Sequence, residues 1–122
     1  MKKRTNLIIS DTNLVLVFKV KISKRVNAML FAVICIDNDN AADVRVEKKS
    51  EHIEFLQKHI SSFKIVGPFL DENDKSIGGI AIIDAKDRDS LNLLVAQDPF
   101  VASGVFKEVR IYPWRDTFGK LG

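Results

Sequence analysis

The segment over residues 97–105 holds a carboxylate whose position its neighbours dictate. Asp98 precedes Pro99, and this pair is typical of a helix N-cap with proline at the first helical position. Gly104 can end such a short helix in the left-handed conformation that other residues resist. The pattern therefore predicts a carboxylate fixed at the start of a short helix, just before a strand. Capping alone would explain the position of Asp98, so a catalytic role requires a partner.

A basic face on a helix predicted over residues 41–62 offers candidate partners. Arg45, Lys49, His52 and His59 are spaced by four, three and seven residues, which places them along one side of a helix. An imidazole can give or take a proton near neutral pH. The neighbouring cations could hold an anionic group of a substrate. Spacing alone is also consistent with four surface residues, and we expect His59 to be structural or solvent-facing.

The elements that must position these residues follow one another from Met29. The pattern predicts strand, helix, strand, strand, helix and strand over residues 29–36, 41–62, 63–66, 77–83, 90–97 and 105–112. This order is the split βαβ arrangement of a ferredoxin-like fold, an α+β fold with a four-stranded antiparallel sheet. Two helices cover only one face of such a sheet. The same face of a second copy would cover the other, which predicts a homodimer with a barrel-like interior.

Local signals make more detailed predictions about each element. Gly67 with Pro68 is expected to end the second strand, and Pro113 the last one. Gly78 with Gly79 predicts a bulge or a close approach of another group within the third strand. Asp89 or Ser90 is expected to cap the second long helix. The core stripes are expected at Val46, Ile53, Leu56 and Ile60 in the first long helix and at Leu91, Leu94 and Val95 in the second.

Charge and composition restrict the classes of protein to consider. The 122 residues fit one domain, but their charge is uneven. Seven of the 19 Lys and Arg and one of the 16 Asp and Glu lie in residues 1–28, a net charge of +6, which leaves −3 on residues 29–122. We therefore treat residues 1–28 as a basic N-terminal extension, strand-like over 14–22 or disordered, and residues 29–122 as the domain. An alternative is that the natural protein starts at Met29.

Several partners and ligands are not expected. The net negative domain would repel phosphate, so we expect no nucleic-acid partner. No apolar run approaches the roughly 20 residues of a membrane span. The single cysteine, Cys35, cannot form an internal disulfide and fits a reducing, cytoplasmic setting as a small buried hydrophobe. His52 and His59 would lie about 10 Å apart along a helix, too far to share one metal ion, so we expect no metal.

Residues 29–118 resemble the YciI-like (YCII-related) family of small dimeric α+β barrel proteins. The matching features, in chain order, are Met29-Leu30-Phe31, the spacing of Arg45 and His52, Val66-Gly67-Pro68, the segment from Asp98-Pro99-Phe100 to Gly104-Val105, and Pro113-Trp114. The Asp-Pro-aromatic segment with its later glycine is the most specific of these features. Residues 1–28 lie outside the resemblance.

The resemblance implies an active site. In that family a histidine of the first helix and the aspartate of the Asp-Pro segment form a conserved pair in a cleft beside the sheet, and by position these are His52 and Asp98. Arg45 and Lys49 would bind substrate, although the family commonly has arginine where this chain has Lys49, which lacks the bidentate fork. The wider superfamily includes isomerases of muconolactone type and cofactor-free monooxygenases.

The resemblance and the residues together predict an enzyme without a cofactor. Asp98 would fix the tautomer of His52, which would act as acid or base in an isomerisation, an elimination or a hydrolysis. The substrate would be a small organic molecule that can carry a negative charge. The alternative is a non-catalytic module that binds a small ligand or a partner through the same cleft.

Overall fold

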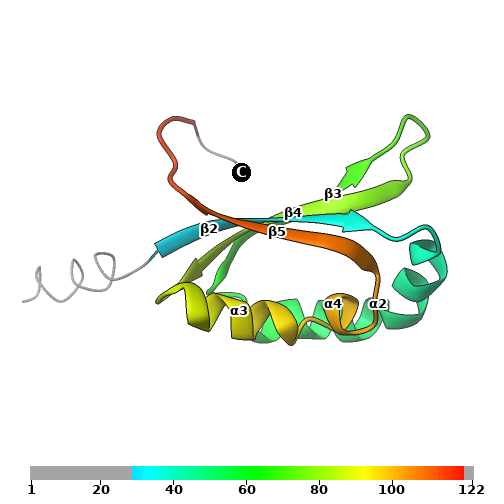
Figure 1. Ribbon diagram of the computed structural model, residues 1–122, viewed down its shortest axis with the longest axis horizontal. Coiled ribbons are helices and arrows are strands. Elements are labelled where there is room, and N and C mark those ends of the chain that lie inside the picture. Colours follow the sequence, from blue (N-terminus) through cyan, green and yellow to red (C-terminus); the bar gives the residue numbers. More distant parts are fainter. Residues whose placement is uncertain (1–28, 120–122) are drawn as a thin grey trace, which may run out of the picture.

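The computed structural model describes residues 29–119, so the expectations for residues 1–28 lie outside the described residues. One four-stranded antiparallel sheet lies on one layer of helices (Figure 1). The elements in order are β2 (Met29–Asp37), α2 (Ala41–Lys58), β3 (Phe63–Leu70), β4 (Ser76–Ala85), α3 (Arg88–Ala96), α4 (Pro99–Ala102) and β5 (Phe106–Trp114). The predicted α+β, ferredoxin-like fold is confirmed.

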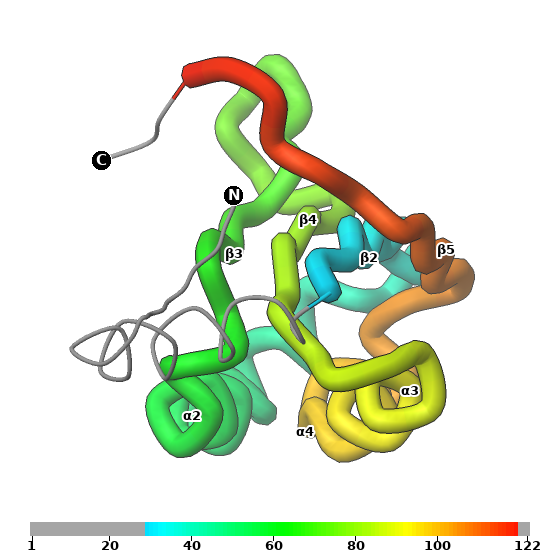
Figure 2. Tube along the Cα trace, turned by 90° about the vertical axis from the view of Figure 1, so that its left-hand side faces the viewer, coloured from blue at the N-terminus to red at the C-terminus, as the bar shows by residue number. Residues whose placement is uncertain are grey.

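The sheet has the strand order β3-β4-β2-β5, with β2 and β4 in the middle. All its neighbouring strands are antiparallel, and Phe31 of β2 lies opposite Ile83 of β4. The helices lie on a single face, α2 on the β3 side and α3 with α4 on the β5 side (Figure 2). This topology places the start of α4 beside the middle of α2.

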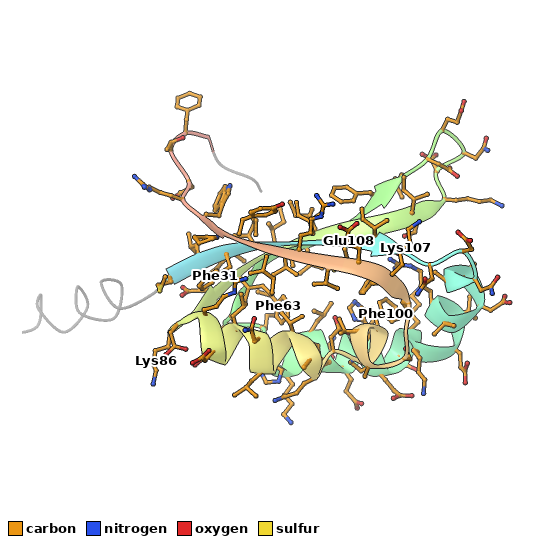
Figure 3. The ribbon with its side chains drawn as sticks, viewed as in Figure 1. Phe31, Phe63, Lys86, Phe100, Lys107 and Glu108 are labelled. Atoms are coloured by element: carbon orange, nitrogen blue, oxygen red, sulfur yellow. The ribbon has the colours of Figure 1, made fainter. Side chains whose placement is uncertain are left out.

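The main core lies between the sheet and α3. Phe31, Val33 and Ile83 from the central strands pack with Leu91 of α3 and are all buried. Leu94 and Val95 pack against this cluster, which confirms the stripe predicted for the second long helix. Figure 3 shows Phe31, Phe63 and Phe100 in the layer between the sheet and the helices.

The apolar stripe predicted for α2 is correct only in part, because Val46, Ile53 and Leu56 line a cavity between this helix and the sheet and are not packed into a core. Val46 and Ile60 are 80% and 71% exposed, and Ile53 is also exposed. The buried residues of α2 are Ala41 and Phe55. The inward face of α2 also carries polar side chains, because a cavity separates part of this helix from the sheet. The helix ends at Lys58 and not near residue 62, since residues 59–62 form a turn.

Two prolines lie inside strands that they were expected to end. Pro68 lies within β3 and Pro113 within β5. Both strands are at the edges of the sheet, where a residue without an N–H group need not break the ladder. The predicted close approach at Gly78 is confirmed, because a Cβ there would clash with the carbonyl oxygen of Cys35.

The predicted cap of the second long helix is also wrong. Asp87, and not Asp89 or Ser90, is the N-cap of α3, and its side chain accepts a 2.8 Å hydrogen bond from the Ser90 amide. This backbone hydrogen bond lowers the pKa of Asp87 below its usual value.

The face of the sheet opposite the helices is largely apolar. Val109 and Ile111 of β5 pack on the helix side, so their neighbours Arg110 and Tyr112 point to the open side. Ile34 and Ile80 lie on the same open side, in a row with Arg110. Among the described residues, no helix covers this face (Figure 1).

Replacing Leu91 with alanine tests the position of the main core. Leu91 is fully buried, so we expect Leu91→Ala to lower the free energy of unfolding by about 2–5 kcal/mol. Leu93, on the same helix, is 67% exposed, so Leu93→Ala should change it by no more than about 0.5 kcal/mol. Urea denaturation of both variants measures the difference. Equal costs would contradict the packing of α3 described above.

Candidate active site

Asp98 occupies the position that the local sequence predicts. It is the N-cap of α4, and its Oδ1 accepts a 2.9 Å hydrogen bond from the Phe100 amide, with Pro99 at the first helical position. Gly104 has a φ of 81°, as its predicted role in ending the helix requires. Phe100 and Val105 are buried together with Ala41 of α2. This packing fixes α4, and with it the carboxylate of Asp98, against α2.

His52 points from α2 to this carboxylate. Its Nδ1 lies 2.8 Å from Oδ1 of Asp98, a contact between residues 46 positions apart. Both side chains are only 15% exposed. Because an ionised carboxylate only accepts hydrogen bonds, the proton of the imidazole is assigned to Nδ1, which leaves Nε2 free to accept one. The structure thus brings together the two residues that the family resemblance pairs.

The imidazole is also held by an aromatic ring. The ring of His52 stacks on that of Phe100, with a centroid distance of 3.8 Å and an interplanar angle of 9°. Phe100 follows Asp98 by two residues, so one short segment provides both the hydrogen-bond acceptor and the stacking partner. In the sequence Phe100 is recognisable only as part of the Asp-Pro-aromatic motif, and its stacking on His52 was not predicted.

A cavity of about 450 Å³ opens between α2, the sheet and α4. Its wall contains all four predicted site residues, namely Arg45, Lys49, His52 and Asp98. Most of the remaining wall is apolar, and its sheet side includes the small residues Cys35, Gly79 and Ala81. This volume lies within the range of small-molecule sites, which are mostly apolar with a few placed polar groups.

Arg45 is engaged by a partner that the sequence did not reveal. Its Nε and Nη2 each donate a 2.9 Å hydrogen bond to the two carboxylate oxygens of Asp37, at the end of β2. Its Nη2 also lies 3.4 Å from the carbonyl oxygen of Gly78. The fork that could clamp a substrate carboxylate is therefore already occupied within the protein.

Lys49 and His59 differ in their relation to the cavity. Lys49 lies in the cavity wall and is exposed, and within residues 29–119 it forms no ion pair. His59 is absent from the wall and packs against Phe55, with a centroid distance of 4.9 Å. Of the four residues predicted to share one side of the helix, Arg45, Lys49 and His52 line the cavity and His59 does not.

Cys35 lies in the cavity wall as an uncharged thiol. Burial raises its pKa to about 12, and the negative charge of Asp98 adds to this effect. A thiol with this pKa is a poor nucleophile at neutral pH, because the thiolate is the reactive form. Among the described residues that line the cavity, His52 is therefore the one whose side-chain type ordinarily serves as a proton donor and acceptor.

The family model of the YCII-related domain matches residues 29–115, so the chain belongs to this family. No curated protein sequence gives a significant match. Among solved structures, the chain is similar to 5-chloro-2-hydroxyhydroquinone dehydrochlorinase (TftG) from Burkholderia phenoliruptrix AC1100, solved in complex with 2,5-dihydroxybenzoquinone. The two share 23% sequence identity with a TM-score of 0.67, over 73% of this chain and 96% of that one.

Two further solved structures are more distant. The uncharacterized protein TM1266 from Thermotoga maritima is 14% identical with a TM-score of 0.40, over 73% of this chain and 98% of that one. At3g17210 from Arabidopsis thaliana is 15% identical with a TM-score of 0.43, over 76% of this chain and 99% of that one. None of the helices that the structure describes is long and apolar enough to cross a membrane.

Alanine variants of the two N-cap residues Asp87 and Asp98 measure how much the hydrogen bond between Asp98 and His52 contributes to the free energy of unfolding. Asp87→Ala removes only a cap and should cost about 1 kcal/mol in the free energy of unfolding. Asp98→Ala also removes a hydrogen bond to a charged acceptor, so we expect a total cost of about 2.5–4 kcal/mol.

The same substitution in a His52→Ala background isolates the contact. There the cost of Asp98→Ala should fall to about 1 kcal/mol, because only the cap is lost. Denaturant unfolding of the four proteins of this cycle gives the coupling energy. A coupling near zero would mean that the hydrogen bond between His52 and Asp98 contributes nothing to stability.

Proposed function

We propose that this protein is a cofactor-free acid–base enzyme acting on a small organic molecule bound in the cavity. The observation that carries the proposal is the hydrogen bond between His52 and Asp98 in the wall of a largely apolar cavity. His52 is the group that transfers the proton, and Asp98 is its orienting partner. A carboxylate on Nδ1 raises the basicity of Nε2 and stabilises the imidazolium that forms when Nε2 takes a proton.

Proton abstraction by Nε2 leads to two related reactions. In an elimination, the electron pair of the broken C–H bond forms a double bond as a leaving group departs from the neighbouring carbon. In an isomerisation, the imidazolium returns the proton to another carbon of the same molecule. The apolar wall favours both, because electrostatic interactions are stronger where water is excluded.

The similarity of this chain to TftG supports the proposal of an elimination reaction, because TftG provides a precedent for it. That protein is a dehydrochlorinase, and its structure holds 2,5-dihydroxybenzoquinone, a small oxygenated ring. For this chain we propose a substrate of similar size with one anionic group. Lys49, which is exposed at the cavity wall, is the cation that would contact this group. Arg45 adds positive charge to the wall while its fork remains on Asp37.

We also propose that the protein forms a homodimer through the open face of the sheet. An apolar sheet face left in water is costly, and the same face of a second copy would cover it. Tyr112 and Trp114 are 50% and 43% exposed in the single chain. Tyr112 lies on this face, and burial in a dimer interface would account for an aromatic side chain at such a position.

Replacing His52 tests the proposed chemistry. Ligands would first be found by a thermal-shift screen of small carboxylated, phenolic and quinonoid compounds, since a ligand that binds only the folded state raises its melting temperature. For a compound that is turned over, His52→Ala should lower kcat by about 10²–10⁴-fold, the usual contribution of general acid–base catalysis. Lys49→Gln should mainly raise KM.

His59→Ala is the matched control, because His59 lies on the same helix but outside the cavity. It should leave kcat and KM unchanged. Full activity of His52→Ala would rule out the proposed mechanism. Ligands that bind in the cavity of the wild type but are never turned over would instead favour the non-catalytic binding module.

Light scattering tests the proposed dimer. The mass at micromolar concentration should be twice the 13.7 kDa of one chain. Ile34→Glu places a charge on the open face and should give the monomer mass. Leu93→Glu, at an exposed position of α3 away from that face, should remain dimeric. A wild-type protein of 13.7 kDa in solution would refute the dimer.

A further inference from the structure

Phe100 contacts two side chains that lie two turns apart on α2. The His52 ring is stacked on it at a centroid distance of 3.8 Å, and Cζ of Arg45 lies over the same ring, 5.1 Å from its centroid. Seven residues of a helix rise by about 10 Å, so the two side chains reach the ring from positions well apart along α2. The ring of Phe100 therefore contacts both the imidazole and the guanidinium.

The guanidinium is itself fixed in place. Both of its hydrogen bonds to Asp37 are 2.9 Å long, and the Asp37 side chain is only 8% exposed. Cζ of Arg45 also lies 5.6 Å from the ring centroid of Phe106, the first residue of β5. A chain of contacts thus runs from Asp37 at the end of β2 through Arg45 and Phe100 to His52.

We propose that Arg45 is a positioning residue, which fixes the ring of Phe100 and through it the orientation of His52. One hydrogen bond from Nδ1 to Asp98 leaves the imidazole free to tilt about that bond. Parallel stacking on a ring that cannot move removes this freedom. The N–H bond at Nδ1 of His52 then points directly at the carboxylate of Asp98, and the lone pair of Nε2 keeps a fixed direction.

This role differs from substrate binding by Arg45. It uses the planar, bidentate form of the guanidinium, so lysine would not replace it. The inference rests on the proposed function only for its effect on turnover. The orientation of His52 can be measured without any substrate.

The test compares the two neutral tautomers of His52 by long-range ¹H–¹⁵N NMR at about pH 9, where imidazoles are ordinarily neutral. In the wild type the proton should lie on Nδ1. Phe100→Leu removes the flat ring while keeping an apolar side chain, and should lower the ratio of the Nδ1–H to the Nε2–H tautomer by at least about tenfold. Arg45→Gln should lower the ratio by about threefold or more, and Arg45→Lys by a similar factor.

The double variant Arg45→Gln/Phe100→Leu shows whether Arg45 acts through the ring. We expect it to match Phe100→Leu alone, because no stacked ring remains for the guanidinium to fix. Lys48→Gln is the control, since it removes another cation–carboxylate pair of α2, with Glu51, and Lys48 lies outside the cavity wall. It should leave the tautomer ratio unchanged.

Removing Arg45 alone leaves the buried carboxylate of Asp37 unpaired, which can unfold the protein. The variant Arg45→Gln/Asp37→Asn removes both charges, so it keeps the test decisive. A wild-type ratio in this folded variant would overturn the inference, as would a full additional effect of Arg45→Gln in the Phe100→Leu background. If the ratio stays at the wild-type value while His52→Ala abolishes turnover, the proposed function stands and this inference fails.

Discussion

The hydrogen bond between His52 of α2 and Asp98 at the start of α4 joins two residues that lie 46 positions apart in the chain. It forms only because α4 is pressed against α2 by the burial of Phe100 and Val105 beside Ala41. The Asp98 carboxylate makes two hydrogen bonds through one oxygen, because the Oδ1 that caps α4 also accepts the hydrogen bond from the imidazole of His52. Capping therefore fixes the carboxylate before any ligand binds, and a preorganised acceptor needs no rearrangement during proton transfer.

Because α2 lines the cavity, it contributes less to the packed core than an amphipathic helix normally does. An amphipathic helix normally buries one apolar stripe, but the side of α2 that lines the cavity also carries Arg45 and His52, and Val46 in this wall remains 80% exposed. The core that stabilises the fold lies instead under α3, around Phe31 and Leu91. This separation leaves one half of the layer free to hold a cavity while the other half is packed.

The sequence predicted those features that depend on local chemistry. The cap at Asp98, the turn at Gly104 and the order of helices and strands along the chain each follow from neighbouring residues, and the family resemblance added the pairing of His52 with Asp98. Local patterns could not predict that Val46 and Ile53 stay exposed, because a helix next to a cavity does not pack its apolar face against the sheet. They also could not predict which strands lie at the edge of the sheet, the feature that allows Pro68 and Pro113 inside strands, or that Asp37 would hold Arg45.

The most direct measurement is the ¹⁵N spectrum of the His52 imidazole in the wild-type protein, with the same spectrum of Asp98→Ala beside it. We expect a single neutral tautomer with the proton on Nδ1, which exchanges slowly with solvent because both side chains are only 15% exposed. In Asp98→Ala this preference should be lost. A proton on Nε2 in the wild type, or one tautomer ratio in both proteins, would contradict the claim that Asp98 orients His52.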